Sequence, residues 1–296
     1  MIGRWLLTQM PDFVSTPISS AAVQQVYALQ EGVFPPTTHE PAAGRTWADI
    51  MRMFEGMLFS LTERLSELSC VERVWIAHSR RAGEFLSIAS ANCELVVSRF
   101  RHQTALTLRG PETRMTTADC PLEGEWIGIR FKVGTFFHRF PPAALSDRRD
   151  VTAADASARS FWLDGSAWEY PTFENADTFV GRLLRKGILV RDRIVGGVVR
   201  GELDGVSMRS VQRAFRRATG ITQAAFRTIE RARYATSLLR EGAAIADVVH
   251  RAGYFDQPHL TRSLKYLIGQ TPGEIVRRTR QLSLLYKTAP PPGARL

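Results

Sequence analysis

Residues 207–220 have the sequence SMRSVQRAFRRATG, which predicts a short helix with two contrasting faces. Ser207 is a favourable N-cap, and Gly220 is a favourable residue just beyond the last turn of a helix. Apolar residues recur at i, i+3, i+4 and i+7, and they form one stripe at Val211, Ala214, Phe215 and Ala218. The pattern therefore predicts a helix that buries this stripe and exposes its other side.

The exposed side of this helix has five hydrogen-bond donors and no acid: Arg209, Gln212, Arg213, Arg216 and Arg217. Arg can pair with guanine and Gln with adenine through two bonds each, while arginines farther along the helix can contact phosphate. A merely solvated charged face is the competing interpretation, and the absence of any acid weakens it. We therefore expect this helix to enter a major groove.

A second unit of the same kind follows. Residues 245–252 predict a short apolar helix, Gly253 supplies a turn, and Asp256 caps a further helix with Pro258 in its first turn. This order is typical of a helix-turn-helix. A metal or general-base role for His259 is the alternative to a DNA contact, but no Cys, Asp or second His within this helix is placed to help it. The outward residues are Gln257, His259, Thr261, Arg262 and Lys265.

The two units are joined by a predicted helix that is capped by Thr222 and ends near Arg240. At ~1.5 Å per residue this helix spans roughly 28 Å. One turn of B-DNA is about 34 Å, so two helices held at its ends can enter successive major grooves. After the second unit, residues 271–274 (TPGE) predict the start of a last short helix.

The basic residues are concentrated in this part of the chain. Residues 1–190 have 20 Lys+Arg and 21 Asp+Glu, whereas residues 191–296 have 19 Lys+Arg and 8 Asp+Glu. Genomic codon bias toward arginine is the alternative explanation, but it would have spread the basic residues evenly along the chain. The asymmetry favours a polyanion-binding module joined to a neutral one.

Composition and motifs exclude several classes of protein. The 296 residues are 44% hydrophobic, which is enough for real cores and excludes disorder as the main state. Cys70, Cys93 and Cys120 are too scattered for a zinc pair or a disulfide framework. No GxSxG, HExxH, GxGxxG or phosphate-binding loop occurs, so we expect no enzyme, no cofactor and no metal. Without a signal peptide or an 18-residue apolar run, the expected location is the cytoplasm, with no membrane partner.

The N-terminal part predicts an α+β organisation. Residues 1–46 are an irregular extension, and residues 47–68 have the period of an amphipathic helix. The period then changes to two, and short strands are predicted at 71–76, 94–100, 105–108 and 126–131, which suggests a small barrel or sandwich. A helix follows after Asp164. The predicted domains are 47–190, 191–281 and a tail at 282–296.

The basic region contains a set of motifs: SxRxVQRxF at 207–215, TG at 219–220, RAR at 231–233, GYFDQPHLTR at 253–262 and GQTP at 269–272. Through these motifs, residues 206–276 resemble the DNA-binding domain of AraC/XylS-type transcription regulators. The resemblance implies two helix-turn-helix units that read promoter DNA, with Arg209, Gln212 and Arg213 as base readers of the first unit. It implies Gln257, Pro258, His259, Thr261 and Arg262 as the surface of the second, and RNA polymerase as a partner.

The middle segment is similar to the cupin-like domain of such regulators, through VERVW at 71–75, LxGPxT at 108–113 and GIRFxxG at 128–134. That similarity implies a domain that senses a small-molecule effector, forms a homodimer, or both. His78, His102 and His138 lie on separate predicted elements, which argues against a metal site. A group of aromatic residues lines either an apolar pocket or only the core: Trp126, Phe131, Phe136, Phe137, Phe140, Phe161, Trp162 and Trp168.

Two other nucleic-acid classes compete with a sequence-specific regulator. A non-specific architectural protein would explain the charge, but it does not need two capped units spaced by about one helical turn. A DNA-repair methyl acceptor needs a reactive, metal-bound cysteine cluster, and the three cysteines are too scattered to form one. The sequence therefore favours a regulator that recognises specific DNA.

Overall fold

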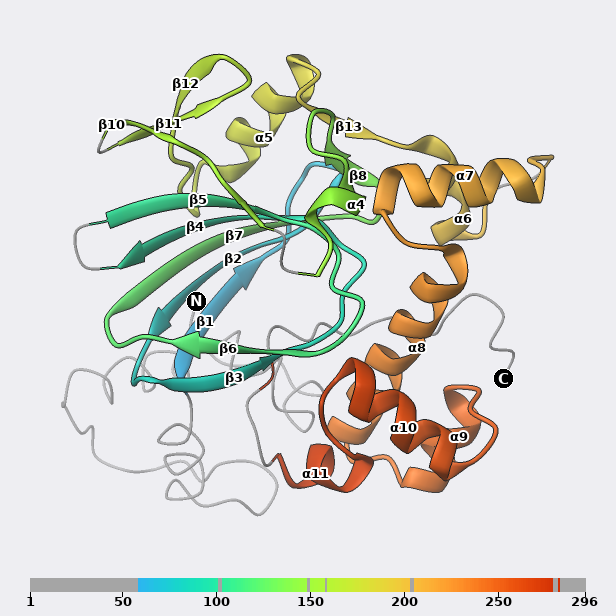
Figure 1. Ribbon diagram of the computed structural model, residues 1–296. Helices are drawn as coiled ribbons and strands as arrows, with labels where there is room; N and C mark the ends of the chain where they lie inside the picture. The colour runs from blue at the N-terminus through green and yellow to red at the C-terminus, as the bar shows by residue number, and fades with distance from the viewer. Residues whose placement is uncertain are drawn as a thin grey trace, which may run out of the picture.

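The computed structural model describes residues 58–100, 103–147, 150–157, 159–202, 205–278 and 282. An antiparallel β region comes first in the chain, and a helical region follows it (Figure 1). The extension predicted for residues 1–46, most of the predicted tail and His102 lie outside the described residues. None of the helices in the described part of the chain is long and apolar enough to cross a membrane.

Six strands form the main sheet, in the order β1-β2-β7-β4-β5-β9, and every neighbouring pair is antiparallel. The predicted strands at 71–76, 94–100, 105–108 and 126–131 are all present, mostly with longer ends. The strand bounds are β1 Phe59–Arg64, β2 Val71–Ser79, β4 Glu94–Phe100, β5 Gln103–Arg109, β7 Gly124–Phe131 and β9 Val151–Thr152.

The helix predicted over residues 47–68 is wrong in its described part, because Phe59–Arg64 is strand β1. Residues 47–57 lie outside the described residues. The segment FSLTER alternates, so Phe59 and Leu61 are buried on one face, and its backbone pairs with β2 from Phe59↔Ser79 to Arg64↔Val74. Strand pairing with a distant segment satisfied the backbone hydrogen bonds that a local helix would have used.

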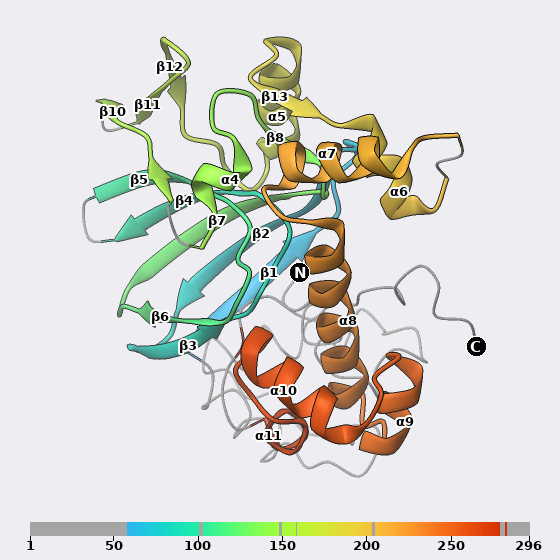
Figure 2. The ribbon, with the colours of Figure 1, turned by 45° about the vertical axis from the view of Figure 1, so that its right-hand side comes forward.

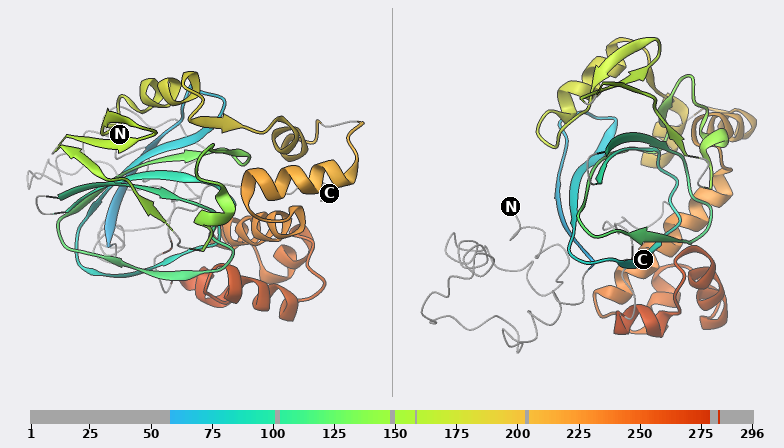
Figure 3. Two further views of the ribbon diagram at one scale, coloured as in Figure 1. Left: turned by 45° about the horizontal axis from the view of Figure 1, so that its top comes forward. Right: turned by 60° about the vertical axis from the view of Figure 1, so that its left-hand side comes forward.

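A two-stranded ribbon, β3 (Gly83–Ser87) with β6 (Thr116–Cys120), lies across from the main sheet (Figures 1 and 3). Phe59, Leu61 and Trp75 of the sheet and Cys120 of the ribbon belong to one buried apolar cluster. The ribbon and the sheet therefore pack on a common interior, and they also leave a cavity between them.

Helix α5 (Ala176–Arg185) buries Ala176, Phe179, Val180 and Leu183, as its apolar stripe predicts. It lies beside a small sheet of β10 (Asp155–Ser157), β11 (Ser160–Leu163) and β12 (Ser166–Glu169). β13 (Leu189–Arg191) then pairs with β8 (Thr135–Phe137) and leads into the helical region.

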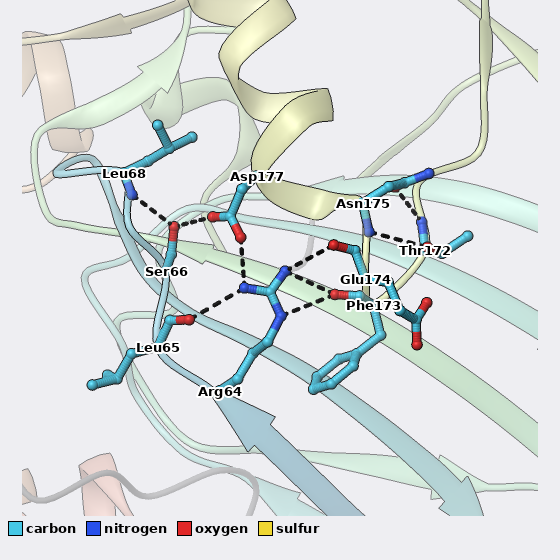
Figure 4. A network of polar contacts seen from close by, with 9 residues as sticks. All are labelled: Arg64, Leu65, Ser66, Leu68, Thr172, Phe173, Glu174, Asn175 and Asp177. Carbon is cyan, nitrogen blue, oxygen red and sulfur yellow. Dashed lines mark hydrogen bonds and ion pairs between the residues drawn. The ribbon is translucent and has the colours of Figure 1, made fainter.

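An arginine at the end of β1 fastens α5 to the main sheet (Figure 4). The Arg64 guanidinium donates to the Phe173 carbonyl at 2.8 and 3.0 Å and to an Asp177 carboxylate oxygen at 2.6 Å. Ser66 donates to the other oxygen of Asp177. Because this network is partly buried and includes a charge-assisted pair, it fixes where α5 begins.

Most of the aromatic group singled out in the sequence belongs to the core of the β region. Phe131, Phe137, Phe161 and Trp168 are buried, and Phe136 and Phe140 pack against the core clusters. Trp162 is 52% exposed and Trp126 alone of the group lines the cavity. The core interpretation therefore holds for most of these rings.

The helical region begins with α6 (Arg193–Arg200), capped by Asp192. α7 (Met208–Thr219) is capped by Ser207 and ends before Gly220, as predicted, and Gly220 is in the left-handed conformation. α8 (Gln223–Arg240) is capped by Thr222. The second unit consists of α9 (Ile245–Arg251) and α10 (Gln257–Leu267), with Gly253 at a φ of +68° in the turn. α11 (Pro272–Arg277) starts with a complete capping box between Thr271 and Glu274.

The two regions share one core. Leu86, Ile88, Ala89 and Ala91 of the β region belong to the buried cluster that also contains the apolar residues of α7, α8 and α10. At the other end of α8, the short helix α4 (Pro142–Leu145) contacts α7. A Cβ at Gly220 would lie only 2.6 Å from the Ala143 backbone nitrogen. The β region thus touches the helical region at both ends of α8.

Gly220→Ala is expected to destabilise the protein more than Gly253→Ala, by about 1–3 kcal/mol of unfolding free energy. Both glycines have positive φ, at +72° and +68°, so alanine is strained in both by ~1–2 kcal/mol. Only at Gly220 would the added methyl also meet the backbone of α4, since nothing lies within 4 Å of the position at Gly253. Urea unfolding of both variants measures the difference, and equal losses would contradict a tight contact between α4 and α7.

Candidate nucleic-acid interface

Helix α7 presents the predicted donors to solvent. Val211, Ala214, Phe215 and Ala218 are buried, and the Phe215 ring contacts that of Phe226 on α8 at a centroid distance of 5.6 Å. This packing fixes the rotation of α7 about its axis. The five residues on the opposite face are all exposed: Arg209, Gln212, Arg213, Arg216 and Arg217.

Arg217 has a partner that sequence reasoning missed. Its guanidinium pairs with the carboxylate of Asp192, whose side chain is only 3% exposed. The same carboxylate caps α6 by accepting from the backbone N–H groups of Ile194 and Val195, at 2.9 and 3.1 Å. Arg217 therefore belongs to the joint between α6 and α7, whereas the other four donors of this face have no ion pair among the described residues. The position of Asp192 ahead of an apolar run was the available signal.

Helix α10 exposes Gln257, Pro258, Arg262 and Lys265 and buries Leu260, Leu264 and Leu267. Asp256 caps it by accepting from the His259 N–H at 2.6 Å. The His259 ring is half-buried, meets the Tyr254 ring edge-on at 5.1 Å and accepts from the Phe255 N–H at 3.5 Å. His259 is thus built into the turn, and Thr261 beside it is also half-buried.

Phe255 is a surface residue that no sequence pattern singled out for a role. It is 90% exposed and directly precedes the cap of α10. A large apolar side chain held in water beside an exposed helix start is unusual, and it suits contact with a partner. Its place within the motif at 253–262 was the signal that could have singled it out.

Arg231 joins the second unit to α8. Its guanidinium lies 4.7 Å from the centre of the Tyr254 ring and donates to the Gly253 carbonyl at 3.3 Å. This stacking holds the glycine turn of the unit against the long helix. The turn and the start of α10 are therefore fixed relative to α8.

The two exposed helices are attached near opposite ends of α8 (Figure 2). α8 has 18 residues, which corresponds to a length of ~27 Å. The separation that α8 gives the two exposed helices is close to the ~34 Å spacing of successive major grooves. The arrangement can place two groups of donors on one face of a duplex.

The helices described above match a known protein family. Residues 204–278 match the model of a family described as a helix-turn-helix domain. These residues form an AraC-type helix-turn-helix domain. No curated protein and no solved structure matches the chain. The AraC-type domain contains α7 to α11, a quarter of the chain, and it binds DNA.

The cysteines do not offer a nucleophile beside the AraC-type domain. Cys70, Cys93 and Cys120 are buried free thiols. Burial, with a smaller contribution from Glu94, raises the pKa of Cys93 to about 12, so this thiol is protonated at neutral pH. Within the described ranges, no group of three or more His, Cys, Asp or Glu side chains could hold a metal ion.

The β region contains a second candidate site, a cavity of about 320 Å³ between the main sheet and the β3–β6 ribbon. Its size is at the lower end of the range for small-molecule sites. Aromatic rings line one part of it, including Trp75 and Trp126, and charged groups line another, including Arg109 and Arg130.

Asp192→Ala is expected to lower the unfolding free energy by about 1–2 kcal/mol, because the variant loses both cap hydrogen bonds of α6. Arg217→Ala removes only the ion pair, and its side chain is 66% exposed, so its cost is expected to stay below about 1 kcal/mol. Urea unfolding of the two variants gives the comparison. A larger loss for Arg217→Ala would show that Asp192 acts mainly through the ion pair.

Iodoacetamide is expected to leave Cys93 unmodified in the folded protein at pH 7.5 while alkylating it rapidly in denaturant. The reason is the raised pKa of this buried thiol, which keeps the reactive thiolate scarce. Mass spectrometry of the alkylated peptide reports the outcome. Rapid native-state alkylation of Cys93 would instead show that this thiol can act as a nucleophile.

Proposed function

We propose that this protein is a sequence-specific transcription regulator of the AraC/XylS type whose two helix-turn-helix units read adjacent major grooves. The observation that carries the proposal is the pair of exposed, donor-rich helices α7 and α10 attached near the two ends of α8. Such a pair can contact base edges at two positions about one helical turn apart.

Individual residues take separate roles in this proposal. Bases are read from α7 by Arg209, Gln212 and Arg213 and from α10 by Gln257 and Arg262. Phosphates are contacted by Arg216, Arg217 and Lys265, with Pro258, His259 and Thr261 completing the surface of the second unit. Because Arg217 is paired with Asp192, a phosphate must compete with that carboxylate, and Arg216 is the stronger phosphate candidate of α7.

The N-terminal part, residues 47–190, is proposed as a cupin-like barrel that binds a small-molecule effector and takes part in a homodimer. The cavity between the sheet and the β3–β6 ribbon supports effector binding. The DNA-binding part then spans residues 191–281. Its partners are promoter DNA and RNA polymerase in the cytoplasm of a bacterial cell.

A non-specific architectural protein is the alternative. It accounts for the excess of basic residues, which a protein that coats DNA would use against phosphates alone. It does not account for Gln212 and Gln257, neutral side chains that sit at the centre of one exposed face and at the start of the other. Glutamine suits the edge of adenine better than it suits a phosphate.

Selection from a random DNA pool by the purified protein, at about 150 mM salt, is the experiment that separates these functions. We expect the surviving sequences to share two blocks whose centres lie about one helical turn apart, ~10 base pairs. A pool that stays random, with binding lost as salt rises, would overturn sequence-specific recognition in favour of the architectural alternative.

Arg213→Ala is expected to weaken binding to the selected sequence by about 1–3 kcal/mol and to relax preference at one base pair. Arg216→Ala, the matched variant one turn along, is expected to weaken all sequences alike and to lower the salt slope by about one. Fluorescence anisotropy on selected and scrambled duplexes measures both. If Arg213→Ala weakened the two duplexes equally, base reading by Arg213 would be wrong.

A further inference from the structure

The cavity in the β region has an apolar part and a polar part. Phe59, Trp75, Phe85 and Trp126 supply rings, and Leu61 and Val96 lie among them. The Trp75 side chain is buried, and its Nε1–H has no hydrogen-bond partner among the described residues. A buried donor without a partner costs free energy; the hydroxyl oxygen of an alcohol could accept from it, whereas a protonated amine has no acceptor to offer.

The charged groups of the cavity argue against an anionic ligand. The Arg130 guanidinium already faces Glu94 at 3.3 Å. Arg109 already faces Asp150 at 3.3 Å and Glu112 at 3.8 Å. With Asp119 at the rim, four carboxylates and two guanidiniums line the space. A ligand carboxylate would find both cations engaged and an excess of like charge, whereas a hydroxyl or ammonium group would find acceptors.

One segment of chain is shared by the cavity and the AraC-type domain. We call residues 86–92 the shared wall. Ser87, Ser90 and Asn92 line the cavity, whereas Leu86, Ala89 and Ala91 belong to the core cluster of α8 and α10. Ile88 belongs to both sets. The two faces of one short segment thus touch the cavity and the DNA-binding domain.

The backbone of the shared wall is bonded directly to the helices. The Ala89 N–H donates to the carbonyl of Leu267, the last residue of α10, at 2.8 Å. The Ala89 carbonyl accepts from the buried guanidinium of Arg233 on α8 at 3.3 Å. Movement of Ala89 would therefore strain or break bonds to both the long helix and the recognition helix.

A polar chain connects the cavity to the same helix. Arg130 donates to the Ser90 hydroxyl at 2.6 Å, Ser90 to the Asn92 side chain at 3.2 Å, and Asn92 to Glu72 at 2.7 Å. Ser90 and Asn92 belong to the shared wall, and Ala89 of the same segment accepts from Arg233 of α8 at 3.3 Å. The polar chain thus reaches α8 through the backbone of the shared wall.

We propose that the cavity binds a small alcohol or amine with a ring-sized apolar body, and that the shared wall couples its binding to DNA binding by the AraC-type domain. The proposal rests on the function proposed above and adds the chemistry of the effector and its route to the DNA reader. The hydroxyl or amino group of the ligand lies beside Arg130 and Glu94. Ser90 then adjusts, and the displacement of Ala89 alters how α8 and α10 are held.

Three probes of similar size test the ligand class on the full chain: 2-phenylethylamine, 2-phenylethanol and 3-phenylpropanoate. Ligand-observed NMR or calorimetry is expected to show the amine and the alcohol binding at least about tenfold tighter than the carboxylate. Ala118→Leu, which fills the cavity, is expected to abolish that binding. Tighter binding of the carboxylate, binding that survives Ala118→Leu, or no binding of any probe would overturn the ligand class.

The coupling is tested with the better-binding probe and the duplex selected from the random pool. The probe is expected to change the DNA Kd by about fivefold or more, and the duplex must change the probe Kd by the same factor. Arg233→Lys is expected to bring this factor close to one, because a lysine cannot hold both Glu230 and the Ala89 carbonyl. Arg227→Lys, an exposed position on the same helix, is the matched control and should keep the full factor.

Ser90→Ala interrupts the route from the cavity side and is expected to lower the same factor, which covers the case in which Arg233→Lys does not fold. Urea unfolding establishes folding for each variant. A full coupling factor in either folded variant would overturn the role of the shared wall. If the random pool yields no preferred sequence, the proposed function falls and the coupling with it, whereas the probe titrations still decide the ligand class by themselves.

Discussion

The packing of residues 86–92 against α8 and α10 is the constraint on which the arrangement of the molecule depends. Ala89 bonds to both helices through its backbone, and Arg233, whose side chain is 2% exposed, bridges 144 positions of sequence to reach its carbonyl. A buried guanidinium and buried backbone groups are costly to leave unpaired. The β region therefore holds the DNA-binding helices in one place instead of trailing them on a flexible linker.

α8 has to satisfy neighbours on several sides at once. It packs on α7, on α9 and α10, and on the shared wall, so its buried residues lie around much of its circumference and include Arg233, Thr236 and Ser237. Thr236 bonds back to the Ala232 carbonyl at 2.8 Å, which satisfies a hydroxyl that would otherwise be buried alone. A helix enclosed in this way is stiff, so it holds the exposed helices α7 and α10 at a constant separation.

The surface of α7 and α10 and the cavity in the β region differ in whether their positive charges are paired. On α7 and α10, arginines and lysine remain in water with few acids near them, so a polyanion can take up their charge. In the cavity, Arg130 is buried and Arg109 is half-buried, and both are already matched by carboxylates. The same residue type stays available to a polyanion in one region and is a scaffold for hydrogen bonds in the other.

The sequence by itself determined the local elements. Helix caps at Ser207, Thr222, Asp256 and Thr271 act within three residues of where they stand, and the apolar periods of α5, α7 and α10 each reflect a single buried face. The exposed donors of α7 and α10 followed from those periods. The positions of strands β2, β4, β5 and β7 also followed from local sequence, although β4 and β7 bury residues on both faces. Only the tertiary structure decided the strand at Phe59–Arg64, the pairing of Arg217 with Asp192, and the cavity with its shared wall. These features join residues that no local pattern connects, because each depends on which distant segment arrives to supply a hydrogen bond, a counter-charge or a covering surface.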